Sequence, residues 1–304
     1  MRVSLDGWLD AFMSKRRTLK TVTIGVGAVV LALSAAIWIA GVVLTHPARA
    51  VIGAPPADFP ARDVSIESAS GALLHGWFAP GSGKGAVLLL HGVRANRLSM
   101  LDRARFLHDA GYSVMLVDFQ ASGESSGSGI TFGYLESRDA AAALAELKRL
   151  APGERVGIVG TSMGGAAILL ADPPLDANAI VLEQVYPTLS QALDDRLELH
   201  AGVVGRWLAP LLAVTVKPRL GVTMEQMRPI DRISQIRVPK LLIVGDADQH
   251  TRLAESMAMY QAAAEPKALW VVRGAAHVDL CKYGGMEYRT RLLAFLDHWL
   301  RPSS

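Results

Sequence analysis

The sequence predicts an α/β fold with a mostly parallel, doubly wound sheet of eight strands. Between residues 63 and 300, short apolar runs typical of buried strands alternate with longer segments of helical composition. Several of these runs are followed by glycine and polar residues, as expected where parallel strands end at a ligand crevice. A long uncharged segment precedes this region. We therefore expect one transmembrane helix followed by one α/β domain.

The expected elements follow one another in a regular order. Two strands joined by a turn come first, at residues 64–68 and 73–78, and the continuous apolar run 86–91 is typical of a strand buried on both faces. Further strands are expected at 113–118, 156–160, 179–185, 240–245 and 268–272. Helices are expected at 99–110, 134–150, 163–171, 253–264 and 286–300. Alternation of this kind favours parallel strands connected by helices.

Residues 21–44 are the predicted transmembrane helix. The segment contains no charged residue, and at about 1.5 Å per residue it is long enough to cross a hydrocarbon core of roughly 30 Å. A basic cluster at 15–20 precedes it, which predicts a cytoplasmic N-terminal segment at 1–20 and a catalytic domain on the extracytoplasmic, periplasmic side. The tripeptide 48–50 resembles a signal-peptidase site and leaves cleavage open. The length of the apolar run favours an uncleaved signal anchor.

Two further segments interrupt the pattern. Residues 45–62 contain four prolines, which predicts an extended linker before a domain at 63–300. Residues 188–238 stand where one crossover connection would need only about a dozen residues, and they include an apolar run at 203–216 with Trp207. We expect a helical lid insertion here, because long insertions in compact domains are usually functional. Extra helical packing without a gating role is the alternative.

Composition excludes several classes of function. The single cysteine, Cys281, excludes an intrachain disulfide and a zinc–cysteine cluster. The net charge is +3, and no run of Lys and Arg with interleaved aromatic residues indicates nucleic-acid binding. We expect no cofactor, no metal and no nucleic-acid partner, and composition leaves the oligomeric state open.

The pattern G-x-S-x-G at 160–164 predicts a catalytic nucleophile. A strand-like run leads into it and an apolar run of good helix propensity follows, which is the context of a nucleophile elbow with Ser162 as nucleophile. Small residues are needed around such a strained turn, and Gly160, Gly164 and Gly165 supply them. The same pattern occurs at 123–127, but no helix follows it. We interpret that second match as a loop.

A serine nucleophile needs a base and an acid, and in elbow hydrolases the chain order is Ser, then Asp or Glu, then His. Asp248 lies just after the expected strand 240–245, and His277 follows the expected strand 268–272. We predict His277 as the base and Asp248 as the acid. Asp246 is the alternative acid, although bracing its loop by hydrogen bonds suits it better, and His250 is the alternative base.

The transition state also needs donors for an oxyanion. The backbone N–H of Met163 is one predicted donor, and that of Val93 in the loop after the strand 86–91 is the other. In the same loop, His91, Gly92 and Arg94 are candidate substrate contacts. Trp207 in the insertion is a further candidate.

Taken together, the motifs at 91–92, 160–165, 245–248 and 274–277 resemble the α/β-hydrolase superfamily. Residues 118–125 are similar to a D-x-x-G-x-G-x-S segment of that superfamily, with Ala121 in place of its first glycine. The chain looks closest to the serine aminopeptidase-like hydrolases, although Thr251 and Arg252 stand where many members have a proline after the acid. The resemblance implies an α/β-hydrolase fold and a serine hydrolase.

The predicted function is therefore that of a membrane-anchored serine hydrolase that cleaves an ester or thioester through an acyl-enzyme intermediate. The membrane segment and the apolar insertion favour acyl or lipid substrates. A serine aminopeptidase is the alternative, with Glu183 or Glu198 binding the free amine of a peptide. A non-catalytic binding module on the same fold is the alternative from another class.

Overall fold

Eight strands form one sheet in the computed structural model, which describes residues 5–301, except the side chains of 5–11, 17 and 18. The order across the sheet is β10-β9-β8-β7-β4-β5-β3-β2. The strands are β2 (Arg62–Glu67), β3 (Leu73–Ala79), β4 (Ala86–Leu90), β5 (Ser113–Val117), β7 (Val156–Thr161), β8 (Ala179–Glu183), β9 (Lys240–Gly245) and β10 (Lys267–Val272). Only the pairs made by β3 are antiparallel. The predicted eight-stranded, mostly parallel sheet is confirmed.

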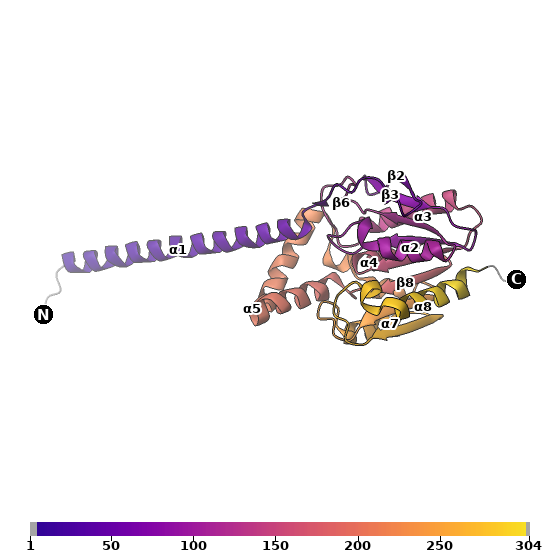
Figure 1. Ribbon diagram of the computed structural model, residues 1–304. Coiled ribbons are helices and arrows are strands. Elements are labelled where there is room, and N and C mark those ends of the chain that lie inside the picture. The colour runs from indigo at the N-terminus through magenta and orange to yellow at the C-terminus, as the bar shows by residue number, and fades with distance from the viewer. Residues whose placement is uncertain (1–4, 302–304) are drawn as a thin grey trace. The chain divides into compact units, whose positions relative to one another are not determined.

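Helices cover both faces of this sheet (Figure 1). One hydrophobic cluster includes residues of α3, α4 and α7, and a second cluster includes residues of α2 and α8. The helices are α2 (Leu101–Asp109), α3 (Glu136–Leu150), α4 (Met163–Leu170), α7 (Leu253–Ala262) and α8 (Leu280–Leu300), and the 3-10 turn η1 (Arg97–Met100) leads into α2. The sheet is therefore doubly wound, as the alternation of strands and helices predicts.

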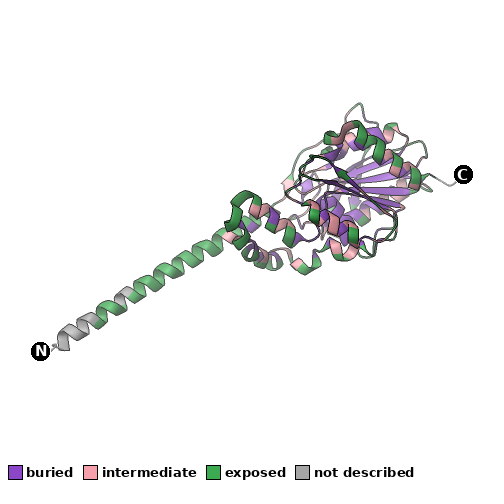
Figure 2. Cartoon of the chain, turned by 90° about the horizontal axis from the view of Figure 1, so that it is seen from below, coloured by how far each residue is buried: buried purple, intermediate pink, exposed green. Residues whose placement is uncertain are grey.

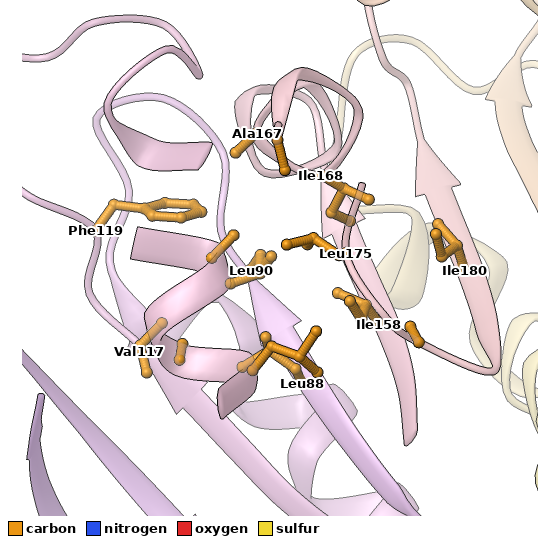
Figure 3. Packing of buried hydrophobic residues seen from close by; sticks show 14 of the residues in the cluster. Leu88, Leu90, Val117, Phe119, Ile158, Ala167, Ile168, Leu175 and Ile180 are labelled. Carbon is orange, nitrogen blue, oxygen red and sulfur yellow. The ribbon is translucent and has the colours of Figure 1, made fainter. Parts of the chain in front are cut away.

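Strand β4 shows why the central runs are apolar at every position. Leu88 and Leu90 pack with Ile168 in one cluster (Figure 3), whereas Val87 and Leu89 belong to the other. Successive side chains of a strand point to opposite faces of the sheet, so a strand that is covered on both sides has no polar side. The buried centre of the sheet fixes the strand ends on which the site is built.

Helix α1 (Leu5–Thr45) forms a unit of its own up to Leu44, and a second unit begins at Thr45. An 18-residue window within the stretch Phe12–Thr45 has a mean hydropathy of 2.5, and the stretch is long enough to cross a membrane. Most of its described side chains are exposed (Figure 2). The helix contains the predicted span 21–44 and extends into the basic segment before it. An anchor and a signal sequence share these properties, so the anchor and its orientation stay predictions.

The predicted linker 45–62 differs from a free extended segment. Strand β1 (Ala48–Arg49) pairs in parallel with β6 (Ser122–Gly123). The backbone N–H groups of Ile52 and Gly53 donate to Oε1 of Glu124 at 3.0 and 2.9 Å, and Phe59 is only 3% exposed. The extended backbone leaves N–H groups that bond to the loop after β5, and the role of this segment as a linker stays a prediction.

The insertion predicted at 188–238 is helical. Its elements are α5 (Leu189–Leu220), the 3-10 turn η2 (Met224–Gln226) and α6 (Pro229–Ile233). Gly202, with φ 57° and ψ −141°, interrupts α5 and divides it into two halves. The helical content of the insertion is confirmed, whereas its role as a lid stays a prediction.

Candidate active site

Ser162 lies between β7 and α4, in a backbone conformation that residues other than glycine rarely adopt. Its φ is 51° and its ψ is −112°, and such a residue costs on the order of 1–3 kcal/mol unless its surroundings hold it. Here its N–H donates to the carbonyl of Glu183 at 2.7 Å, and its carbonyl accepts from the N–H of Ala166 at 3.0 Å. The predicted strand–turn–helix is confirmed.

The three glycines around this turn are needed for close packing. A Cβ at Gly160 would lie 2.6 Å from Cδ1 of Ile168, and a Cβ at Gly164 would overlap the carbonyl oxygen of Leu90. A Cβ at Gly165 would overlap Cγ2 of Val185. Side chains at these positions would push α4 away from the sheet, so the glycines keep the start of α4 against the ends of β4 and β8.

His277 and Asp248 form a hydrogen-bonded pair beyond the carboxyl ends of β10 and β9. Nδ1 of His277 lies 2.7 Å from Oδ2 of Asp248, and the two side chains are 17% and 1% exposed. Oδ1 of Asp248 accepts from the backbone N–H groups of His250 and Thr251 at 2.8 and 2.9 Å. An N–H at Nδ1 donates to the carboxylate, which leaves Nε2 of His277 as a proton acceptor.

Asp246 and His250, the alternative acid and base, lie outside the hydrogen-bonded pair of His277 and Asp248. Oδ1 of Asp246 accepts from the N–H of Gly274 at 2.5 Å, so Asp246 braces its loop as expected. The ring centroid of His250 lies 5.2 Å from that of His277. Nδ1 of His250 accepts from Nε of Arg196 at 3.3 Å. Burial is the largest cause that lowers the pKa of His250, and Arg196 adds to it, so His250 is a neutral neighbour of the pair.

Ser162 and His277 line the same cavity of about 250 Å³. Within residues 5–301, no hydrogen bond joins the Ser162 hydroxyl to the His277 ring, and such bonds often form only with substrate bound. The other residues that line this cavity are Gly92, Val93, Ala95, Ser99, Met100, Arg103, Thr161, Gln184, Arg196, Val278 and Asp279. A larger cavity of about 890 Å³ lies between α3 and the loop after α4, and none of the predicted site residues lines it.

The loop after β4 lies directly beside the serine. A Cβ at Gly92 would lie 3.6 Å from Cβ of Ser162, and Val93 lines the same cavity. Met163 is the first residue of α4 and is 1% exposed. Val93 and Met163 therefore both lie near Ser162, and their role as oxyanion donors stays a prediction.

Three of the predicted substrate contacts lie elsewhere. His91 is fully buried, its Nδ1 lies 2.7 Å from the carbonyl of Gly92, and its Nε2 accepts from the N–H of Phe119 at 3.0 Å. Burial lowers the pKa of its ring, so His91 joins two loops as a neutral side chain. Arg94 and Trp207 are not among the residues that line the cavity, and Trp207 is 77% exposed. The role of these three residues as substrate contacts stays a prediction.

A buried ion pair under the serine was missed from the sequence. Nη2 of Arg103 on α2 donates to Oε2 of Glu183 at 2.7 Å, and both side chains are at most 1% exposed. The hydroxyl of Thr161 donates to the same carboxylate oxygen at 2.8 Å, and the hydroxyl of Tyr288 donates to Oε1. Glu183 thus fixes the elbow by both its backbone and its side chain.

These contacts bear on the peptidase alternative. The carboxylate of Glu183 is fully buried and occupied by Arg103, and that of Glu198 accepts from Arg252 at 2.7 Å. Neither carboxylate is among the residues that line the cavity beside Ser162. Both candidates for binding a substrate amine are therefore already held by arginines.

Gln184 is a second residue that the sequence analysis missed. It is 1% exposed, and its φ is 50°. Its Nε2 donates to Oδ2 of Asp248 at 3.1 Å and to the carbonyl of Ala276 at 2.6 Å. The available signal was its place directly after the apolar strand β8, where polar residues reach the ligand crevice.

A sheet of this order, with a strained serine between strand and helix at its carboxyl edge, defines an α/β hydrolase. Residues 87–281 match the Alpha/beta hydrolase family. The chain belongs to this family.

The chain is also similar to individual members. It is 26% identical to the "Uncharacterized protein YqkD" of Bacillus subtilis over 77% of this chain and 78% of that protein. It is 24% identical to the "Uncharacterized protein YfhR" of Escherichia coli K12 over 85% of this chain and 88% of that one. Among solved structures, the Pyrococcus furiosus esterase Pf2001 superposes with a TM-score of 0.69 at 26% identity, over 84% of this chain and all of that chain.

Proposed function

We propose that the protein is a serine esterase in which Ser162, His277 and Asp248 act as a catalytic triad. The observation that carries this proposal is the 2.7 Å contact between His277 and Asp248 beside a cavity that His277 shares with the strained Ser162. The likeness to the Pyrococcus furiosus esterase supports ester substrates. The chain's family by itself supports a hydrolase.

In the proposed mechanism, Nε2 of His277 takes the proton of the Ser162 hydroxyl as Oγ attacks the acyl carbonyl. The negative charge that develops on the carbonyl oxygen is stabilised by the N–H groups of Met163 and Val93. His277 then gives its proton to the leaving alcohol, and an acyl-enzyme remains. Water, activated by His277, attacks the acyl group and releases the acid. Asp248 keeps the imidazole oriented and stabilises its charged form.

The volume of the cavity limits the size of the acyl group. Its volume of about 250 Å³ lies below the roughly 300–1,000 Å³ of sites for drug-sized ligands. In this conformation the site favours short acyl groups, and a lipid chain would need a movement of α5. Thioesters remain candidates by the same chemistry. The aminopeptidase alternative is disfavoured, because Asp279, a carboxylate that lines the cavity, is already paired with Arg103 at 2.8 Å.

The test uses the full chain in detergent and its Ser162→Ala variant. We would measure hydrolysis of 4-nitrophenyl esters over a series of acyl lengths, and labelling by a fluorophosphonate probe. Loss of a triad nucleophile lowers the rate by about 10⁴-fold or more. Equal rates for both proteins, together with no labelling of Ser162, would establish a non-catalytic module instead.

Membrane anchorage through residues 21–44, with the domain on the periplasmic side, is part of the proposal. The length and hydropathy of α1 support a membrane helix, and the basic residues before it favour this orientation. Protease accessibility of the domain in intact spheroplasts and in lysed cells tests it. Protection in spheroplasts would place the domain in the cytoplasm.

A further inference from the structure

The second half of α5 presents an apolar face to solvent. Val203, Val204, Trp207, Leu211 and Val214 are 72%, 65%, 77%, 48% and 75% exposed. At 3.6 residues per turn, these positions fall on one side of the helix. Surface helices of soluble proteins turn such a side toward the core, and large exposed apolar patches mark interaction sites.

The inward side of the same half-helix fixes this orientation. Ala209 and Leu212 are 2% and 7% exposed, and Val216 packs in a cluster with Leu189. A Cβ at Gly205 would overlap the carbonyl of Leu197, so the two halves of α5 pack against each other at close range. The apolar side consequently cannot rotate inward without breaking this packing.

Charge and position indicate what covers this face. Arg206 and Lys217 are exposed, about three turns apart along one border of the apolar side, and residues 203–220 contain no Asp or Glu. At the end of the helix, Nη2 of Arg219 donates to the hydroxyl of Thr45, the first residue of the second unit. An apolar stripe bordered by basic residues is the composition of helices that lie in a membrane interface.

We propose that the second half of α5 docks on an anionic phospholipid bilayer. Its apolar side chains enter the interface, and Arg206 and Lys217 lie at the level of the lipid phosphates. Thr45, which accepts from Arg219 at the end of this half-helix, is the first residue of the domain. This proposal concerns where the domain rests and is independent of the esterase activity.

Labelling of the full chain in vesicles tests the proposal. Val214→Cys, and Met286→Cys as the matched control, would each carry an environment-sensitive fluorophore. Met286 is 73% exposed on α8, and the native Cys281 is buried. In vesicles of phosphatidylcholine and phosphatidylglycerol we expect a blue-shifted emission and quenching by doxyl lipids for the Val214 label only.

Two results would overturn the proposal. One is a Val214 label that remains as open to water as the Met286 label. The other is burial of the Val214 label that depends on protein concentration and not on lipid, which would identify a second copy as the occupant. The double variant Arg206→Glu with Lys217→Glu should reduce quenching in vesicles that contain phosphatidylglycerol. Unchanged quenching would contradict the proposal that these two basic residues bind anionic lipid.

A separate observation concerns the cavity beside Ser162. Arg196, in the first half of α5, lines this cavity, and its Nε donates to His250. Among the described residues Arg196 forms no ion pair within 4.0 Å, and the carboxylate whose charge acts on it is that of Asp248 in the His–Asp pair. Arg103 in the same cavity is instead paired directly with Glu183 and Asp279. A half-buried guanidinium with no direct carboxylate partner of its own favours an anionic ligand.

We infer that the substrate carries an anionic oxygen group, a carboxylate or a phosphate, which binds Arg196. This inference rests on the proposed esterase function. The anionic group would belong either to the acyl part or to the alcohol part of the ester. A guanidinium holds such a group by paired hydrogen bonds, which a lysine cannot reproduce.

Matched substrates test the inference. 4-Nitrophenyl hydrogen adipate is compared with 4-nitrophenyl hexanoate for the acyl side, and 1-acylglycerol 3-phosphate with 1-acylglycerol for the alcohol side. Arg196→Gln should raise KM about tenfold or more for the anionic member of one pair relative to any change for its neutral member. Equal losses on both members of each pair would overturn the inference. Failure of the esterase proposal is recognised separately, because the wild-type chain would then hydrolyse none of the four and leave the fluorophosphonate probe unreacted.

Discussion

The carboxamide of Gln184 joins Asp248 to the segment that carries His277. Its Nε2 lies 3.1 Å from Oδ2 of Asp248 and 2.6 Å from the carbonyl of Ala276, the residue before His277. One buried side chain after β8 thus fixes the loops after β9 and β10 relative to each other. The orientation of the His–Asp pair depends on a third strand.

Gln184→Leu should lower kcat by about 10- to 100-fold, because a hydrogen bond to a charged group contributes roughly 1.5–3 kcal/mol. Steady-state kinetics and thermal melting would be measured together. The exposed Gln261 supplies the control, and Gln261→Leu should change neither quantity. A purely structural role for Gln184 would lower the melting temperature while the kcat of the folded fraction stayed the same.

Asp248→Asn should reduce the rate of ester hydrolysis by about 10⁴-fold, because an amide cannot hold the reactive tautomer of His277. Asp246→Asn should cost far less, since Asp246 bonds only to the backbone of Gly274 among the described contacts. Hydrolysis of a short 4-nitrophenyl ester by both variants is the measurement. The reverse ranking would make Asp246 the acid.

Glu183→Gln should destabilise the fold by about 3–5 kcal/mol, because it removes the buried charge partner of Arg103 and leaves only the partly exposed Asp279. Chemical denaturation measures the loss. The exposed pair Glu287–Arg291, with side chains 61% and 52% exposed, is the control, and Glu287→Gln should cost at most about 0.5 kcal/mol. Similar losses for both variants would contradict the special role of the buried pair.

Gly165→Ala should destabilise the protein by about 1–3 kcal/mol, because the added methyl group overlaps Cγ2 of Val185. Shortening the Val185 side chain tests directly whether this overlap is the cause. The double variant with Val185→Ala should be less destabilised than the sum of the two single changes, and strict additivity in denaturation curves would argue against a clash.

The lowered pKa of Glu124 predicts that the attachment of residues 52–53 to the domain weakens at acid pH. Hydrogen bonds from Gly53, Arg97 and Ile52 lower the pKa of this carboxyl from 4.5 to about 2. A depressed folded pKa contributes stability above the unfolded value, and that stability is lost as pH falls from about 4.5 toward 2. Glu124→Gln should flatten the pH dependence of stability in this window. The exposed Glu67 is the control, and Glu67→Gln should leave it unchanged.

Much of the site follows from local sequence. The strand–turn–helix around Ser162 depends on three glycines within six residues, and the positions of Asp248 and His277 follow from the strands directly before them. Strand ends of a parallel sheet share one edge, so residues that follow different strands meet there without any knowledge of packing. The sequence by itself therefore determined the fold class, the candidate nucleophile and its expected partners.

Only the tertiary structure decided which side chains support these residues and which way the insertion faces. Gln184 and Asp248 are 64 positions apart, and Arg103 and Tyr288 are 185 positions apart, so no local pattern pairs them. Trp207 illustrates the second case, because it is a predicted substrate contact while the helix turns that residue outward. A helical pattern defines a face but not its direction. That direction depends on which surface of the domain receives the other side of the helix.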